Sequence, residues 1–287
     1  MKHIFYLITI LLSFATSLQI MAQTTTTELV MLPQDKVIVE RILLQLKEQQ
    51  SLETGLLVVK VGELFLETPY VASTLEAGDT EKMVINLREL DCTTFAENCL
   101  ALARTIQRKN PDFNGFVDEL KLIRYRDGHM NEYPSRLHYF SDWIYDNDQK
   151  KLVQNMSKEI GNTVFPASVN YMSTHPADYP VLKKHPEFVK HIALQESEIT
   201  NRENWYIPKN KLAACESLLR DGDILGITTT ISGMDISHVV IAVRKDGRIH
   251  IMHASLSHHK VLISDETLEQ YLNTHKAATG IMVARPL

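Results

Sequence analysis

The stretch SHVVIAVRKDGRIHIMHA, Ser237 to Ala254, decides the fold class of this chain. Two runs rich in β-branched residues flank the dipeptide Asp246-Gly247, which is typical of a two-residue hairpin turn. Because the turn centre lies between these two residues, positions that pair across the hairpin sum to about 493. In this register His238 and His253 lie diagonally on one face of the two strands, within reach of each other.

The chain on both sides of this hairpin separates into a helical part and a strand-rich part. Upstream, apolar residues recur every three or four positions, which predicts helices at 35–50, 91–107, 113–125 and 188–198, with a loop and then a helix over 133–143. Around the hairpin the patterns predict strands at 223–230, 261–263 and 280–284, and a helix at 267–272. Residues 56–65, LLVVKVGELF, are β-rich and are expected to form a strand. Helices followed by an antiparallel meander define an α+β fold, and no linker divides it.

The helix with the sequence DCTTFAENCLALARTIQ carries two of the three cysteines. Asp91 or Thr93 can cap its start. Cys92 then lies where unpaired backbone N–H groups and the helix dipole favour a thiolate. The periodicity alone leaves two interpretations of Cys92, a buried core residue and a nucleophile. Cys99 and Cys215 have the spacing of buried packing residues.

The paired histidines suit a nucleophilic mechanism better than a metal site. A nucleophilic cysteine needs a base beside the thiol and a third group that fixes the tautomer of that base. His238 and His253 can supply both, whereas His250 has the opposite parity and points away. Zinc held by Cys92 and the two histidines is the alternative, but no Cys-x-x-Cys or His-Glu-x-x-His motif occurs and no carboxylate joins the pair. We therefore expect no metal and no other cofactor.

The first 22 residues, MKHIFYLITILLSFATSLQIMA, have the layout of a secretory signal peptide. Lys2 and His3 precede an apolar run, and small and polar residues follow it up to Ala22. A membrane anchor is the alternative, but the apolar run is shorter than the roughly 20 residues that a spanning helix needs. We expect export to the periplasm or the medium, and one mature domain over 23–287 without a transmembrane segment.

Composition narrows the classes of partner. Thirty Lys and Arg against 35 Asp and Glu give a formal net charge of -5, which argues against a nucleic-acid protein with a basic face. Three cysteines in 287 residues are too few, and odd in number, for a disulfide framework. A free thiol is a liability in an oxidising compartment, so its retention favours a functional cysteine. The mature protein is expected to be a monomer.

Four short motifs, in the same order along the chain, resemble those of NlpC-type papain-like cell-wall cysteine hydrolases. They are Leu90-Asp91-Cys92-Thr93-Thr94-Phe95, Gly222-Asp223-Ile224, His238-Val239-Val240-Ile241 and His253-Ala254-Ser255. Three further stretches resemble one exported bacterial subfamily, the N-acetylmuramoyl-L-alanine amidase-like proteins. These are SRLHYFSDW at 135–143, MSTHP at 172–176 and GMDISH at 233–238. Two residues depart from the superfamily pattern. Val240 stands where Gly is usual, and Thr94 stands where Gly is common.

The resemblance implies a papain-like fold, in which a nucleophile helix packs on an antiparallel sheet and helical insertions are added. It also implies that Cys92 is the nucleophile, that His238 is its base and later the acid, and that His253 holds His238 in the right tautomer. Ser255, opposite His238 in the predicted register, is an alternative for this last role. The implied substrate is peptidoglycan or a muropeptide, cut between the lactyl group of N-acetylmuramic or anhydromuramic acid and L-alanine.

Candidate substrate ligands lie in the stretch 135–143, which we call the insert, and beside the catalytic residues. Arg136 can pair with a carboxylate. The rings of Tyr139 and Trp143 can cover a sugar, although aromatic pairs at this helical spacing are usually core residues. The remaining candidates are His138, Ser237 and Asp91, and helix capping is the alternative role of Asp91.

Two other functions stay open at this stage. The first is a γ-D-glutamyl-diamino acid endopeptidase, which uses the same chemistry on another bond of the stem peptide. The second is a catalytically silent protein that keeps the fold and binds muropeptides. Dependence of cleavage on the sugar separates the amidase from the endopeptidase, and the reactivity of the thiol separates both enzymes from the binding protein.

Overall fold

The computed structural model describes residues 29–76, 78–166 and 168–287. The predicted signal peptide at 1–22 lies outside these residues. Within them, no helix is long and apolar enough to cross a membrane. The helices are α1 Pro33–Gln45, α2 Thr54–Glu63, α3 Cys92–Ile106, α4 Phe113–Arg124, α5 Phe140–Gln149, α6 Ser157–Gly161, α7 Tyr171–Thr174, α8 Pro180–Lys184, α9 Pro186–Asn201, α10 Leu212–Cys215 and α11 Leu268–Thr274. The strands are β1 Leu29–Val30, β2 Met83–Val84, β3 Val153–Asn155, β4 Thr163–Val164, β5 Trp205–Pro208, β6 Ile224–Thr229, β7 Ile236–Lys245, β8 Arg248–Ser255, β9 Lys260–Thr267 and β10 Ala278–Pro286.

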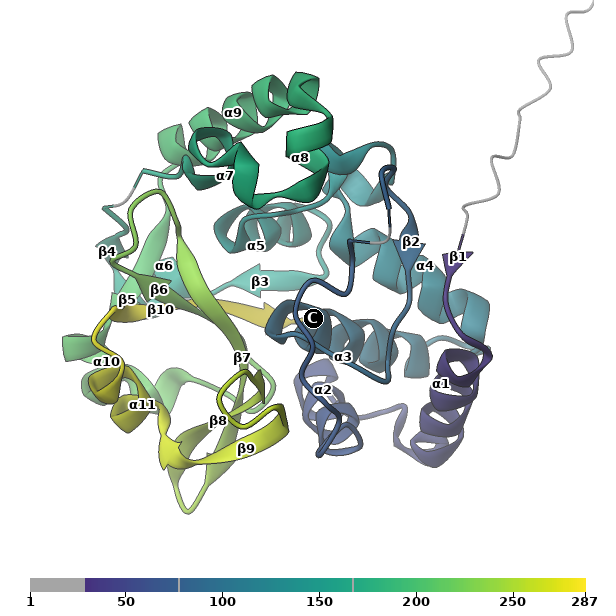
Figure 1. The fold of residues 1–287 in the computed structure, drawn as a ribbon. Helices are drawn as coiled ribbons and strands as arrows, with labels where there is room; N and C mark the ends of the chain where they lie inside the picture. The colour runs from purple at the N-terminus through teal and green to yellow at the C-terminus, as the bar shows by residue number, and fades with distance from the viewer. Residues whose placement is uncertain (1–28, 77, 167) are drawn as a thin grey trace, which may run out of the picture.

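The strands form a small parallel pair, β1 with β2, and one larger antiparallel sheet (Figure 1). The larger sheet has eight strands, in which β4, β5, β10, β6, β7, β8 and β9 follow one another and β3 pairs with β10. In the central hairpin Ile241 pairs with Met252 and Val243 with His250, which is the register predicted from the turn. The α+β class expected from the sequence is therefore confirmed.

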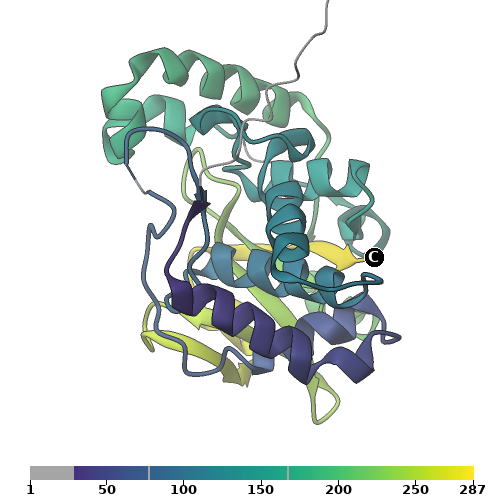
Figure 2. The ribbon, with the colours of Figure 1, turned by 90° about the vertical axis from the view of Figure 1, so that its right-hand side faces the viewer.

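Apolar side chains cover both faces of this sheet. Val239 and Ile241 of β7 pack with a layer that includes α1 to α5, and Figure 2 looks onto α1 at the outside of that layer. Val240 and Ala242 pack on the opposite face with α10 and α11. Because successive side chains of a strand point to opposite faces, a strand covered on both sides is apolar throughout, which explains the run VVIA.

A third apolar cluster lies apart from these two layers. Helices α7, α8 and α9 gather at one end of the molecule in both views (Figures 1 and 2). Their buried side chains, such as Met172, Leu182 and Ile192, pack around Tyr133 and Tyr139 from the segment that leads into α5. The segment 133–143 and the helices after it therefore form one unit, and this unit supplies a wall of the cavity described below.

The prediction of a strand at 56–65 is wrong, because most of these residues belong to helix α2. Leu57, Val58 and Val61 are fully buried and Phe65 nearly so, at the spacing of one helical face. The face packs against α3, where Phe65 meets Phe95 edge to face with ring centroids 6.4 Å apart. The β-branched valines favour a strand by propensity. Burial of this helical face against α3 outweighs that preference.

The turn before β6 needs a glycine for two reasons. Gly222 has a φ of +82°, a backbone conformation that other residues adopt at a cost. A Cβ atom at this position would also lie 2.0 Å from the carbonyl oxygen of Gly55 in α2. The next residue, Asp223, is buried and accepts two hydrogen bonds of 2.8 Å from the guanidinium of Arg285. The motif Gly-Asp before β6 thus joins the sheet to α2 and to the C-terminal strand.

Candidate active site

Cys92 is the first residue of α3, and a capping box fixes this end of the helix. The carboxylate of Asp91 accepts hydrogen bonds from the backbone N–H of Thr94 at 2.7 Å and from its hydroxyl at 2.8 Å. In return, the Asp91 backbone N–H donates to the Thr94 hydroxyl at 2.9 Å. Capping is therefore the role in which the structure places Asp91. Cys92 is partly buried, whereas Cys99 and Cys215 are buried.

The surroundings of Cys92 disfavour a resting thiolate. Burial and the neighbouring Asp91 carboxylate raise the pKa of Cys92 to about 11. The backbone N–H of Val239 and the Thr93 hydroxyl act in the opposite direction without offsetting this rise. The start of the helix therefore does not by itself produce the thiolate expected from the sequence, and the thiol needs a proton acceptor.

His238 and His253 form the pair predicted from the hairpin register. His238 Nε2 lies 2.6 Å from His253 Nδ1, and the two rings meet edge to face with centroids 4.9 Å apart. Because Nε2 of His238 is occupied in this way, its Nδ1 is the ring nitrogen that remains available for proton exchange. Burial, and then the charge of His253, lowers the pKa of His238 to about 3; burial, and then His258, lowers the pKa of His253 to about 4. Both imidazoles are consequently neutral at pH 7.

Two residues that sequence reasoning missed extend this pair into an aromatic cluster. Tyr271 of α11 lies 6.4 Å from His238 and 5.9 Å from His253 between ring centroids. His275 stacks on Tyr271 at 3.9 Å. Their i,i+4 spacing at a predicted helix was the available signal, but nothing in the chain linked that helix to the hairpin. Burial, and then the charge of Cys92, raises the pKa of Tyr271 to about 12.

A cavity of about 220 Å³ joins Cys92 and His238 to the insert. Most of its wall consists of aromatic and other apolar side chains from the segments around α5 and α7. The lining residues are Cys92, Thr93, Leu137, His138, Tyr139, Phe140, Trp143, Tyr171, Met172, Tyr179, Met234, Asp235, Ile236, Ser237 and His238. Six of the nine site residues expected from the sequence thus meet in one cavity.

A larger cleft of about 1080 Å³ adjoins this cavity. Ser237 and His238 line both spaces, and His253 lines the larger cleft. Its lining carries charge of both signs, from Glu67, Lys260, Asp265 and Glu266. The hydroxyl of Ser255 also lies here, 3.0 Å from His258 Nδ1 and 3.1 Å from the Ser257 hydroxyl, and within the described part of the chain no hydrogen bond joins it to His238.

The structure does not bring Arg136 to either space. Its side chain is buried, and its guanidinium pairs with Glu76 at 3.1 Å and with Glu81 at 3.1 Å. It also lies 4.9 Å from the centroid of the Tyr133 ring. These contacts tie the connection between α2 and β2 to the insert. We therefore revise the expectation that Arg136 binds a substrate carboxylate, because its charge is already matched inside the protein.

The other insert residues line the cavity but are also held by the protein. The Tyr139 hydroxyl donates to Glu196 at 2.6 Å and accepts from the backbone N–H of Met172 at 2.9 Å. His138 Nε2 lies 2.9 Å from the carbonyl oxygen of Tyr133, and burial lowers the pKa of His138 to about 3. Trp143 is buried, and its indole N–H has no hydrogen-bond partner among the described residues, which leaves one donor unused beside the cavity.

No group of three or more His, Cys, Asp or Glu side chains within the described ranges is arranged to hold a metal ion. Cys92 and the two histidines thus do not form such a group in this structure. The chemistry that these residues offer is a thiol, a neutral base and a second imidazole that contacts the base.

Comparison with known proteins identifies the family of an α+β chain with this arrangement. Residues 60–281 match the AmiA-like family model, described as N-acetylmuramoyl-L-alanine amidase-like. The chain therefore belongs to this family. No curated protein matches it.

Solved structures with the same fold include proteins from three bacteria. The chain is 38% identical to an N-acetylmuramoyl-L-alanine amidase from Bacteroides uniformis, with a TM-score of 0.78 and coverage of 81% of this chain and 98% of that one. It is 41% identical to a Bacteroides fragilis protein whose name places it among xylanases, with a TM-score of 0.75 and coverage of 78% and 98%. Protein LPG0564 of Legionella pneumophila, 19% identical with a TM-score of 0.67 and coverage of 88% and 95%, shares the fold.

Proposed function

We propose that this chain is a cysteine amidase that hydrolyses the bond between the lactyl group of N-acetylmuramic or anhydromuramic acid and L-alanine in bacterial peptidoglycan or its fragments. The observation that carries the proposal is the contact of 2.6 Å between His238 Nε2 and His253 Nδ1, because His238 lines the same cavity as Cys92. Membership of the amidase-like family supports the reaction, and the residues supply a mechanism for it.

In the first half of the reaction, His238 Nδ1 takes the proton of the Cys92 thiol and Sγ attacks the carbonyl carbon of the amide. A bare Nδ1 requires that Nε2 of His238 carries the proton and donates it to Nδ1 of His253. The low pKa of each ring keeps the pair neutral, so the base is ready at pH 7. The backbone N–H of Cys92, at the start of α3, is the donor that we assign to the oxyanion.

In the second half, the C–N bond breaks and His238 returns its proton to the departing amine of L-alanine. The lactyl group then remains on Sγ as a thioester. Water, deprotonated by His238, attacks the thioester carbon, and Sγ leaves and recovers the proton. The products are the free lactyl carboxylate of the sugar and the stem peptide. Since the thiol pKa is raised, a thiolate forms only during attack, when charge passes onto the substrate.

The features of the cavities fit the two parts of a muropeptide. Aromatic side chains such as Tyr139, Trp143 and Tyr171 line the smaller cavity, and aromatic faces pack well against sugar rings. Ser237 lies between the two spaces, where the scissile amide would pass. A glycosidase of the xylanase kind needs two carboxylates at the bond that it cuts. The described lining of the smaller cavity offers only Asp235, which already accepts from the Ser141 backbone N–H and hydroxyl.

The remaining features that we propose rest on the sequence. The order of the Cys92, Gly222, His238 and His253 motifs supports a papain-like fold of the NlpC type. The leader supports export to the periplasm or the medium after cleavage near Ala22, which leaves one domain over 23–287. We also propose that the mature protein works as a monomer and without a metal.

Mass spectrometry of products from two defined substrates tests the proposal. A disaccharide tetrapeptide should yield the sugar with a free lactyl carboxylate and an intact tetrapeptide. A sugar-free tetrapeptide should stay uncut. Cleavage of the sugar-free peptide after γ-D-glutamate at a similar rate would instead identify an endopeptidase, and binding of both substrates without any cleavage would identify a silent binding protein.

Cys92→Ala is the variant that tests the nucleophile. Turnover should fall to background while the fold and the affinity for the substrate persist, because a small side chain replaces a small one. Cys215→Ala is the matched control, since Cys215 lies in the apolar cluster on the far face of the sheet and should keep full turnover. Residual hydrolysis by Cys92→Ala above background would exclude Cys92 as the nucleophile.

A further inference from the structure

Helix α11 lies beside the histidine pair, at the larger cleft. Tyr271 and His275 of this helix line the cleft together with the pair. The opposite face of the helix carries Leu268 and Leu272, which are buried in the apolar cluster on the far face of the sheet. A capping box at Thr267 fixes where the helix begins. Because residues four apart lie on one helical face, this anchoring sets where Tyr271 and His275 stand, and the mechanism proposed above gives neither residue a role.

The ring of Tyr271 lies against both imidazoles of the pair. Its centroid is 6.4 Å from that of His238 and 5.9 Å from that of His253, distances typical of packed aromatic rings. His275 stacks on the same ring at 3.9 Å, with 22° between the two planes. His275 Nδ1 lies 2.8 Å from the carbonyl oxygen of Tyr271, and since a carbonyl oxygen only accepts, this nitrogen donates. The hydrogen bond holds the His275 ring across the Tyr271 ring.

The register of the hairpin brings the two histidines near each other, but backbone pairing between β7 and β8 stops short of them. Within the described residues, the ladder between these strands ends at the pair Ile241–Met252. Beyond it, His238 pairs with β6 and His253 pairs with β9. The contact of 2.6 Å between the imidazoles therefore depends on the packing of side chains, and Tyr271 is a side chain that packs on both rings.

The larger cleft borders the pair with water and with charge. Its lining carries Glu67, His258, Lys260, Asp265 and Glu266. His275 and Cys92 also lie beside the pair, on α11 and α3. Burial is the main reason why the pKa of each paired histidine is low. A ring that packs on both imidazoles reduces the surface that they expose to the cleft, so it contributes to this burial.

We propose that Tyr271 is a positioning residue whose ring, held by His275, keeps the two paired imidazoles in contact and shields them from the larger cleft. Its effect passes through His238, and it touches none of the reacting atoms of the mechanism. The hydroxyl of Tyr271 makes no hydrogen bond to another described residue, so the ring rather than the hydroxyl carries the effect. The inference rests on the proposed function, because that function makes His238 the base.

Nuclear magnetic resonance of protein labelled in its histidine rings tests the shielding without any substrate. Comparison with His253→Asn assigns the signals of the pair. In Tyr271→Ala the pair should titrate at a higher pH than in the unmodified protein, by about one pH unit or more, since hydrated histidines titrate at about 6.5. Tyr271→Phe, which keeps the ring, should titrate as the unmodified protein does. An unchanged titration in Tyr271→Ala would overturn the proposal.

Steady-state kinetics on a muropeptide test the positioning. In Tyr271→Ala kcat should fall by about tenfold or more while KM changes by less than about twofold, because a slightly displaced base loses much of its effect. The acid limb of kcat/KM should move to higher pH in the same variant, and Tyr271→Phe should restore both properties. A raised KM with normal kcat would make Tyr271 a substrate contact, and an equal loss in Tyr271→Phe would assign the effect to the hydroxyl. Either result contradicts the proposal.

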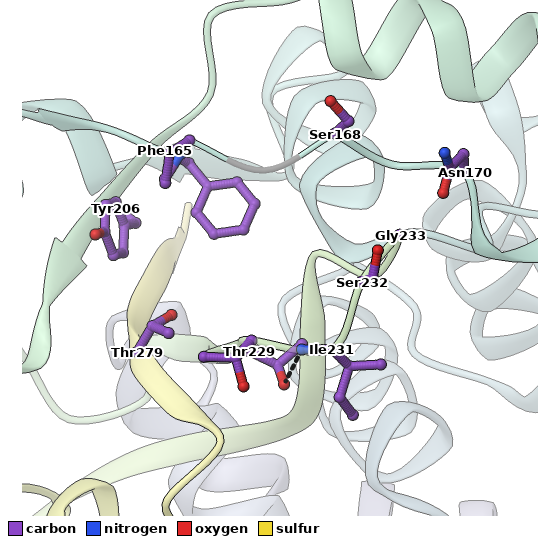
Figure 3. Close-up of a pocket in the computed structure, with 11 residues that line it drawn as sticks. Phe165, Ser168, Asn170, Tyr206, Thr229, Ile231, Ser232, Gly233 and Thr279 are labelled. Carbon is purple, nitrogen blue, oxygen red and sulfur yellow. Dashed lines mark hydrogen bonds between the residues drawn. The ribbon is translucent and has the colours of Figure 1, made fainter.

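Tyr206→Ala is the matched control for the titration. Tyr206 is also a partly buried tyrosine, and its ring packs against Phe165 at 5.4 Å between centroids (Figure 3). It lines a cavity of about 540 Å³ that shares no described lining residue with the larger cleft. Its removal should cost packing but leave the titration of the pair unchanged, so a loss of stability alone does not explain a shift. Asn273→Ala, at an exposed position of α11, should keep full turnover.

His275 supplies a second variant in case Tyr271→Ala does not fold, because His275 is exposed. His275→Ser removes the stack and should shift the titration in the same direction as Tyr271→Ala. His275→Phe keeps a ring and removes only the charge, which acts on the pair more weakly than burial does, so its shift should be smaller. Equal shifts in both variants would show that charge and not stacking acts on the pair, against the proposal. If no muropeptide is cut, the proposed function fails, and the titration still decides whether Tyr271 shields the pair.

Discussion

At the scale of single residues, the candidate nucleophile sits between opposing electrostatic effects. The first position of α3 exposes Cys92 to unpaired N–H groups, which favour a thiolate. The same capping box brings the Asp91 carboxylate next to the thiol, and together with burial this carboxylate raises the thiol pKa to about 11. Asp91 thus stabilises the helix and disfavours the thiolate, and these two effects can be separated by mutation.

Asp91→Asn should separate them, because Asn caps helices about as well as Asp but carries no charge. Removal of the carboxylate should lower the pKa of Cys92, and one pKa unit corresponds to a tenfold change in thiolate fraction. We expect iodoacetamide to label Cys92 faster in Asp91→Asn than in the unmodified protein at pH 8, by roughly up to tenfold. In both proteins the rate should keep rising with pH well above neutrality, since the thiol pKa is raised.

Asp91→Ala is the companion variant for this experiment. It removes the charge and the cap together, so it should also lose about 1 kcal/mol of unfolding free energy, which Asp91→Asn should retain. Cys99, buried in the same helix, should stay unlabelled in the folded protein, so its labelling would report unfolding rather than a change at Cys92. Equal labelling of Cys92 in the unmodified protein and in Asp91→Asn would show that the carboxylate does not control the thiol.

At the scale of elements, the sequence predicted what local rules determine. The turn at Asp246-Gly247 fixed the register of β7 and β8, and so the meeting of His238 with His253. Apolar periodicity and a capping residue predicted the helix that begins at Cys92. The type of α2 could not be predicted in this way, because packing against α3 decides it. Arg136 was expected to bind a substrate carboxylate, because no local pattern links it to its partners 55 and 60 residues upstream.

The ion pairs of Arg136 lead to a prediction about the connection between α2 and β2. Arg136→Met leaves the buried carboxylate of Glu81 without its partner, so the free energy of unfolding should fall by about 3 to 5 kcal/mol in urea titrations. At a temperature where the variant is folded, KM for a muropeptide should stay unchanged. A raised KM with normal stability would instead restore the role of Arg136 as a substrate ligand.

Lys184→Met is the matched control for Arg136→Met. Lys184 pairs with Asp79 of the same connection, but both side chains are more than half exposed. An exposed ion pair contributes little, so this variant should change the free energy of unfolding by less than about 1 kcal/mol.

At the scale of the whole molecule, the candidate site lies where three separately built parts meet. The helix α3 supplies Cys92, the β7–β8 hairpin supplies the histidines, and the unit of α5 and α7 to α9 supplies the aromatic wall. Tyr171, Tyr179 and Met234 come together only through contacts such as those at Gly233. Such contacts join distant segments, and no local pattern in a single sequence encodes them, which is why the cavity itself could not be predicted.

This meeting of parts also buries histidines, and acid should therefore destabilise the whole fold. Burial lowers the pKa of His138 and His238 to about 3 and that of His253 to about 4. Unfolded histidines have a pKa near 6.5. Between pH 6.5 and about 4 the unfolded chain thus binds protons that the folded chain does not bind, and stability falls as the pH falls. Above pH 6.5 these three residues should not make the free energy of unfolding depend on pH.

Urea titrations at pH 7, 6, 5 and 4 measure this effect directly. The raised pKa values of the buried carboxyls of Glu81 and Asp235 act in the opposite direction, so these two groups can weaken the decline but cannot cause it. The decline between pH 6.5 and 5 should therefore be due to histidine, and His253→Asn should make it shallower. His191→Asn, at an exposed position of α9, should leave the slope unchanged. A decline in His253→Asn as steep as in the unmodified protein would mean that the histidine pair does not couple the candidate site to the stability of the fold.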